Sequence, residues 1–100
     1  MLKHIVFFKF KESASAAGVD SLVTAFKGLK TSIKEMKAFE WGTNNSPEQL
    51  NEGLTHCFQA TFATEADRDA YLIHPAHKAF VEQFAKPYVE KAVVLDYWVK

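Results

Sequence analysis

The stretch that decides the fold is Lys3-His4-Ile5-Val6-Phe7-Phe8-Lys9-Phe10, close to the start of the chain. It is rich in β-branched and aromatic residues and holds neither Gly nor Pro, which is typical of a β-strand. Successive side chains of a strand point to opposite faces, so Val6 and Phe8 share one face while Ile5 and Phe7 share the other. Both faces are apolar, and each therefore needs a layer packed against it.

Helical and strand patterns alternate along the rest of the 100-residue chain. Apolar residues at steps of three and four predict an amphipathic helix after the first strand. Thr64 is a good N-cap, Pro75 suits the first turn of a helix, and Pro87 is expected to end or kink that helix. The expected elements are strands at residues 3–10, 37–43, 55–62 and 92–99, and helices at residues 16–34, 64–72 and 75–85.

The order β-α-β-β-α-β predicts the α+β class in a split βαβ arrangement. Four strands then form one antiparallel sheet, and both helical regions lie on one of its faces. The length suits one domain spanning residues 1–100, because the sequence contains no repeat and no linker.

The second face of the sheet predicts a homodimer. Helices cover only one face, yet the other carries Ile5, Phe7, Val93, Leu95 and Tyr97. A patch of this kind exceeds what monomers usually expose, and two-fold pairing with a second copy is the commonest way to bury it. The alternative is cover by long loops, but the longest loop is too short and too polar.

Charge and composition exclude several classes of partner. The 12 basic and 12 acidic residues cancel, without the basic footprint that nucleic acid or a membrane surface requires. No stretch is long and apolar enough to span a membrane, and the start lacks the pattern of a signal peptide. Cys57 is the single cysteine, so no intramolecular disulfide forms and a cytoplasmic setting is expected. No Gly-rich phosphate loop is present, so no nucleotide cofactor is expected.

Polar residues cluster where chemistry could occur. By strand parity, His4, His56 and Asp96 point to the helix-facing side of the sheet. The residues around the expected helix break are Tyr71, His74 and His77, with Pro75 fixing the backbone. Three interpretations remain open: capping and core roles, acid–base chemistry, and metal binding. Two His at a spacing of three are too few for a closed zinc site, so no metal is expected.

These residues also carry a family resemblance. The segments are His4–Phe10, Gly53–His56, Thr61-Phe62, Tyr71-Leu72-Ile73-His74-Pro75-Ala76-His77 and Asp96-Tyr97. In this order they resemble the stress-responsive dimeric α/β-barrel (Dabb) proteins over nearly the whole chain. The resemblance implies a ferredoxin-like fold, a barrel formed by two sheets across a dimer, and a pocket between each sheet and its helices.

The resemblance also implies roles for individual residues. One plant member of the family is a polyketide cyclase that works by an aldol step without a cofactor. By position, Tyr71 would polarise the substrate carbonyl and His77 would be the general base. The implied substrate-binding residues are His4, Phe8, Phe26, Phe39, Trp41, His56, Phe58, His74, Phe80, Tyr88 and Asp96.

The chain departs from the family pattern at Leu54, where Tyr is frequent, and at Lys78, where a smaller apolar residue is common. The bulk of Phe26, Phe58 and Phe80 is expected to shrink the pocket and to disfavour a long alkyl chain. The sequence and the resemblance therefore favour a homodimer that binds a small, partly apolar molecule, and they leave open whether it acts as a cofactor-independent cyclase or lyase. The alternative is a non-catalytic, stress-related structural or small-molecule-binding protein.

Overall fold

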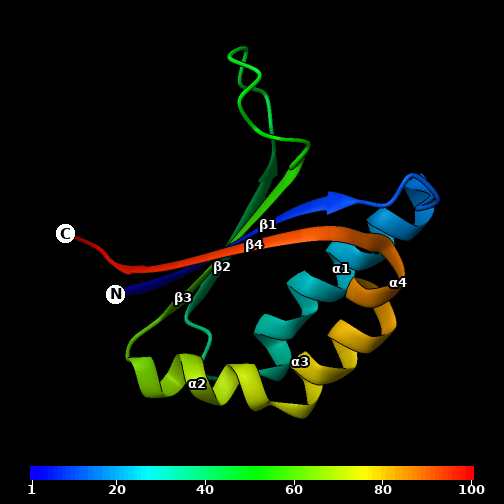
Figure 1. Cartoon of the computed structure of the whole chain (residues 1–100). Helices are drawn as coiled ribbons and strands as arrows, with labels where there is room; N and C mark the ends of the chain where they lie inside the picture. The colour runs from blue at the N-terminus through cyan, green and yellow to red at the C-terminus, as the bar shows by residue number, and fades with distance from the viewer.

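The computed structural model describes residues 1–100 as four strands and a set of helices (Figure 1). The strands are β1 (Leu2–Phe10), β2 (Ala38–Thr43), β3 (His56–Phe62) and β4 (Val89–Trp98). The helices are α1 (Ala16–Ser32), α2 (Glu65–Ile73), α3 (Pro75–Phe80), the π-helical segment η1 (Val81–Ala85) and α4 (Lys86–Tyr88). The expected order β-α-β-β-α-β is confirmed.

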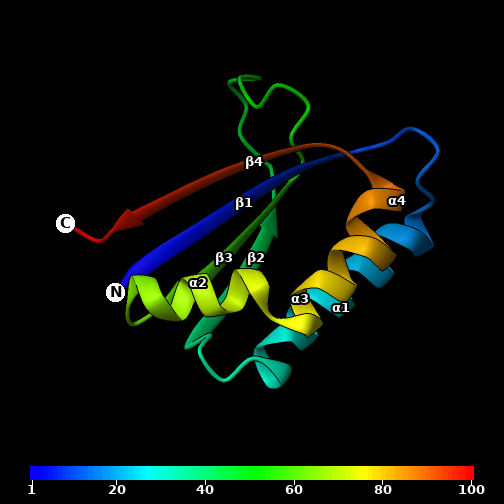
Figure 2. The same cartoon turned by 60° about the horizontal axis from the view of Figure 1, so that its bottom comes forward.

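The strands form one antiparallel sheet in the order β2-β3-β1-β4, which is the ferredoxin-like arrangement. The apolar strand β1 lies in the interior of the sheet and pairs with both β3 and β4. In this register His4 lies opposite Asp96, whereas His56 lies opposite Phe8. Figures 1 and 2 show all the helices on one side of the sheet, as the α+β prediction required.

The core fills the space between the sheet and α1. Ser15 caps α1 by accepting a hydrogen bond from the Gly18 N–H, and the apolar stripe of the helix is buried. Phe26 of that stripe stacks on Phe58 of β3, with 4.6 Å between the ring centroids. The buried apolar cluster comprises Val6, Phe8, Leu22, Val23, Phe26, Leu29, Ile33, Met36, Phe58, Ala60, Phe62, Tyr71 and Phe80.

The second helical region ends at Tyr88, one residue after Pro87 and three residues later than expected. α3, η1 and α4 follow one another without a break to Tyr88, and Pro87 lies in the first turn of α4, where its missing N–H is tolerated. The Lys86 N–H bonds to the Val81 carbonyl, the wider spacing of a π-helix. β4 starts at residue 89, earlier than expected, because Val89 pairs with Phe10.

The sheet face opposite the helices is largely uncovered. Leu95 is 57% exposed, and Val93, Tyr97 and Val99 are exposed as well. Ile5 belongs to this face but is only 7% exposed, because its neighbours on β3 and β4 flank it. The loop of residues 44–55 projects beyond the sheet in Figure 1. None of the helices is both long enough and apolar enough to cross a membrane.

Candidate active site beneath the β1–β4 edge

A cavity of about 620 Å³ lies between the β1–β4 edge of the sheet and the helices α2, α3 and η1. The edge strand β4 is not covered by a helix here, so Val94 is exposed although it points to the helix side. The lining residues are His4, Val6, Phe8, Phe26, Arg68, Asp69, Tyr71, Leu72, His77, Phe80, Val81, Ala85, Ala92, Val94 and Asp96. Ten of these 15 are hydrophobic, so the cavity suits a largely apolar ligand with a few polar groups.

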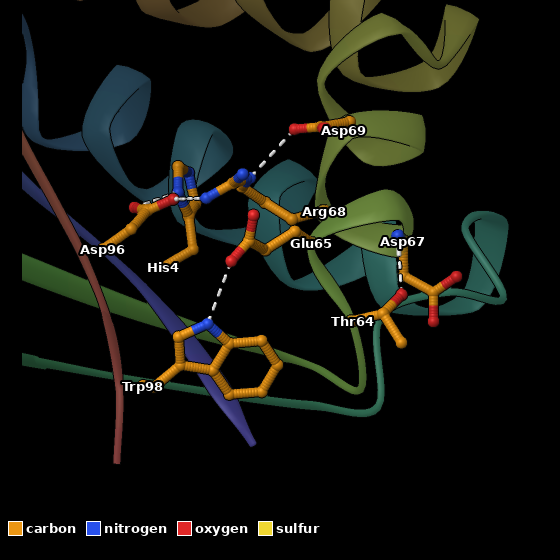
Figure 3. Close-up of polar contacts among 8 residues, drawn as sticks. All are labelled: His4, Thr64, Glu65, Asp67, Arg68, Asp69, Asp96 and Trp98. Carbon is orange, nitrogen blue, oxygen red and sulfur yellow. Dashed lines mark hydrogen bonds and ion pairs between the residues drawn. The ribbon is translucent and has the colours of Figure 1, made fainter. Parts of the chain in front are cut away.

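The break between α2 and α3 brings Tyr71 and His77 together. Thr64 caps α2 by accepting a hydrogen bond from the Asp67 N–H at 3.0 Å (Figure 3). Pro75 then starts α3, and this turn places the His77 ring against the Tyr71 ring, with 4.5 Å between the centroids. The expected helix break is therefore confirmed.

The hydrogen bond of His77 fixes its tautomer. Its Nδ1 lies 3.1 Å from the Leu72 carbonyl oxygen, which can only accept, so Nδ1 carries the hydrogen. The neutral ring then has its lone pair on Nε2. Burial lowers the pKa of His77, an effect that the Leu72 hydrogen bond partly offsets and the nearby His4 reinforces. The ring is thus a neutral base at pH 7.

Tyr71 is fully buried, and its hydroxyl is a buried side-chain polar atom that lacks a hydrogen-bond partner. Burial raises the pKa of Tyr71, and the negative charge of Asp96 raises it further. The hydroxyl therefore stays protonated and remains a donor. An unpaired buried hydroxyl costs about 1–3 kcal/mol, which a ligand carbonyl could recover.

A charged array forms the wall of the cavity beside these residues. Asp96 Oδ1 lies 2.7 Å from His4 Nδ1, and Asp96 Oδ2 accepts from Arg68 Nη1 at 2.9 Å (Figure 3). Arg68 Nε also donates to Asp69 at 3.0 Å. The array links α2 to β1 and β4.

A second contact joins α2 to β4 close by. The Trp98 indole N–H donates to a Glu65 carboxylate oxygen at 3.0 Å (Figure 3). Two side-chain links between the same helix and the edge strand therefore hold this wall of the cavity in place.

A family model described as the stress responsive A/B barrel domain matches residues 2–99. The chain belongs to the stress-responsive A/B barrel domain family. The resemblance inferred from the sequence is thus confirmed, together with its ferredoxin-like fold.

Relatives within the A/B barrel family carry different names. The stress-response A/B barrel domain-containing protein HS1 of Arabidopsis thaliana is 35% identical over 96% of this chain and 87% of its own length. The olivetolic acid cyclase of Cannabis sativa is 30% identical over 96% of this chain and 94% of its own. The structure of a hydroxynitrile lyase from Passiflora edulis superposes with a TM-score of 0.91 at 33% identity, covering 99% and 93% of the two chains. More distant ferredoxin-like proteins, at 22–24% identity, are described as dimeric.

The A/B barrel brings seven of the predicted site residues together around the cavity and leaves six outside it. Those that line it are His4, Phe8, Phe26, Tyr71, His77, Phe80 and Asp96. Those that do not are Phe39, Trp41, His56, Phe58, His74 and Tyr88. Phe26 and Phe80 line the cavity without filling it, while Phe58 lies in the core beneath.

The register explains why His56 does not join His4. Both rings point to the helix side, as parity predicts, but His56 pairs with Phe8, four residues along β1. Four residues of strand amount to about 13 Å. His56 stacks instead on Trp41, with 6.0 Å between the centroids.

His74 and Tyr88 are engaged in packing and capping. His74 Nδ1 accepts a hydrogen bond from the Ala76 N–H at 3.0 Å and so caps α3. The Tyr88 ring lies where a Cβ on Gly18 would be, at 2.8 Å, so Gly18 is needed for this packing. Neither side chain borders the cavity.

A second hollow of about 590 Å³ lies under the loop of residues 44–55 and includes Trp41, His56 and Cys57. Its His56 Nδ1 is already hydrogen-bonded to the Thr55 hydroxyl at 2.8 Å. Burial raises the pKa of the Cys57 thiol, which disfavours the reactive thiolate. The hollow also lacks a buried unpaired donor, so the cavity beneath β4 is the better candidate for chemistry.

Arg68 and Asp69 line the cavity, although they were not among the residues predicted from the sequence. Arg68 lies three residues before Tyr71 on α2, so the two share a helix face. This spacing from Tyr71 is the sequence pattern from which Arg68 could have been predicted as a site residue. No group of three or more His, Cys, Asp and Glu side chains is placed to hold a metal ion.

Proposed function

We propose that this A/B barrel protein binds a small, partly apolar carbonyl compound beneath β4 and acts as a cofactor-independent lyase or aldol-type cyclase. The observation that carries the proposal is the contact between Tyr71 and His77. It places a neutral imidazole 4.5 Å, centroid to centroid, from the ring of a buried tyrosine whose hydroxyl has no partner. Relatives named as an olivetolic acid cyclase and a hydroxynitrile lyase support the same reaction class.

In the lyase direction, His77 Nε2 takes the hydroxyl proton of a cyanohydrin. The carbonyl forms as the bond from carbon to the nitrile breaks, and the cyanide leaving group receives the proton back from the imidazolium. Tyr71 donates a hydrogen bond to the substrate oxygen, for which its hydroxyl, closed off in the free protein, opens to the cavity when the ligand binds. General base catalysis of this kind contributes about 10²–10⁴-fold to the rate.

The ring-lined end of the cavity selects the body of the ligand. Phe8, Phe26 and Phe80 provide aromatic surface there, whereas the polar residues gather on the α2 side. An aromatic aldehyde or its cyanohydrin matches this division, because its ring is apolar and its polar groups lie at one end of the molecule.

The test measures the release of benzaldehyde from benzaldehyde cyanohydrin through the absorbance of the aldehyde. We expect release above the buffer rate by the unmodified protein, and none above buffer by His77→Ala. Equal release by both proteins would refute the assignment of His77 as the general base. Ligand binding in calorimetry without release would instead support the non-catalytic, small-molecule-binding role.

We also propose that the protein is a homodimer through the sheet face opposite the helices. The exposed apolar side chains of Val93, Leu95 and Tyr97 support this, since a patch of this kind usually marks an interface. Phe7 and Val93 also border the second hollow, so the hollow is continuous with the proposed interface.

A further inference from the structure

The Asp96 carboxylate is occupied on both oxygens. Oδ1 faces His4 Nδ1 at 2.7 Å, and Oδ2 accepts from Arg68 at 2.9 Å (Figure 3). Arg68 has a second acceptor, Asp69, on its own helix. The hydrogen bonds to Asp96 and then to Asp69 raise the pKa of Arg68, so its charge is permanent.

This arrangement fixes the tautomer of His4. A carboxylate that already binds a guanidinium is ionised and can only accept, so the hydrogen in the short contact belongs to His4 Nδ1. When the His4 ring is neutral, its lone pair is therefore on Nε2, as it is in His77. The Nε2 atom makes no hydrogen bond within the chain, yet it is absent from the buried unpaired atoms, so it keeps access to the cavity.

We propose that Arg68 is a positioning residue that holds Asp96 so that His4 presents a second base to the cavity. The inference deepens the proposed function, on which the use of His4 as a base rests. Tyr71 lies between the two imidazoles, with its ring centroid 5.6 Å from His4 and 4.5 Å from His77. One donor is therefore next to two rings whose tautomers are set by the partners of their Nδ1 atoms, Asp96 and the Leu72 carbonyl.

Arg68 acts on Asp96 through its positive charge as well as through the geometry of its hydrogen bond. Asp96 has one cation, Arg68, that is always charged, so the Asp96 charge does not need a protonated His4 to balance it. If Arg68 were neutral, His4 would be the sole ionisable partner of Asp96. The imidazolium form would then be favoured, and that form has no lone pair with which to accept a proton.

The experiment measures the ¹⁵N shifts of the His4 ring at pH 7 by long-range NMR, without substrate. The unmodified protein is expected to show a protonated Nδ1 and an unprotonated Nε2. Arg68→Met is expected to shift the ring toward the imidazolium, and Arg68→Lys, which keeps a charge, to restore the neutral ring in part. Lys86→Met is the matched control, because it removes a surface ion pair with Glu82 away from the array.

An unchanged His4 spectrum in Arg68→Met would overturn the proposal, as would an unprotonated Nδ1 in the unmodified protein. With a substrate, Arg68→Met should lower kcat about tenfold, since it acts through a base. The two proposals fail separately. An absence of release by the unmodified protein would refute the lyase function, and turnover that survives His77→Ala would refute His77 as its base, whereas the NMR result would still decide the role of Arg68.

Discussion

The ring of His77 packs against the ring of Tyr71 at an interplanar angle of 50°, and the Tyr71 hydroxyl beside it is buried without a partner. Functional groups left unsatisfied in this way reduce the stability of the free protein. Ligand binding can recover the lost hydrogen bond, so the same hydroxyl can destabilise the fold and serve the site.

Replacing Tyr71 by Phe should therefore separate stability from function. We expect the free energy of unfolding to rise by about 1 kcal/mol, because an unpaired buried hydroxyl is removed and the ring is kept. Aldehyde release from the cyanohydrin should fall at the same time. Urea denaturation and the absorbance assay on one preparation measure both, and a clear loss of stability would show that the hydroxyl is satisfied in solution.

His77 and His74 offer a matched pair, because they flank the same proline and differ in what they contact. His77→Ala should lower kcat by about 10²–10⁴-fold, the range for loss of a general base. His74→Ala should retain turnover and lose about 1 kcal/mol of stability, because it removes the cap of α3. Retained turnover in His77→Ala together with lost turnover in His74→Ala would assign the general base to His74.

Stability should fall as the pH drops below the ordinary histidine pKa of 6.5. Burial lowers the pKa of His56, partly offset by Asp20, and it also lowers the pKa of His77. Below pH 6.5 the unfolded chain binds protons that the folded chain does not yet bind, so acid favours unfolding until the folded pKa values are reached. Above pH 6.5 both states are neutral at these rings, and this contribution to the pH dependence disappears.

Urea midpoints at about pH 7.5 and about pH 5.5 measure this effect. We expect a lower midpoint at the acid pH, and a smaller difference in the double variant His56→Gln, His77→Gln. The same difference in the double variant would mean that other groups cause the pH dependence.

The fold could be predicted from the sequence because it depends on local patterns. The alternating apolar residues of β1 and the helical stripe through Leu22 and Phe26 determine which faces are buried, and the structure follows them. Pro87 lies one residue before the end of the second helical region, so the proline located that end to within a few residues.

The residues that line the cavity could be predicted only in part, because they depend on the register and the order of the strands. Parity correctly put His4, His56 and Asp96 on one face, but register alone separates His56 from the other two. Phe39 and Trp41 are on β2, at the opposite edge of the sheet from β4. Arg68 was missed because its partner, Asp96, lies 28 residues away in sequence.

The homodimer can be tested with two neighbouring residues of β4 that point to opposite faces. Leu95 is 57% exposed on the proposed interface, and Val94 is 55% exposed at the cavity on the helix side. Leu95→Glu should produce a monomer of 11.3 kDa in size exclusion with light scattering, because pairing would bury an unpaired charge.

Val94→Glu carries the same charge at nearly the same exposure and should remain dimeric, while its ligand binding weakens. Monomer formation by both variants would indicate that β4 pairs edge to edge rather than face to face. A dimer in both would place the interface elsewhere, and the apolar face would then need another partner to cover it.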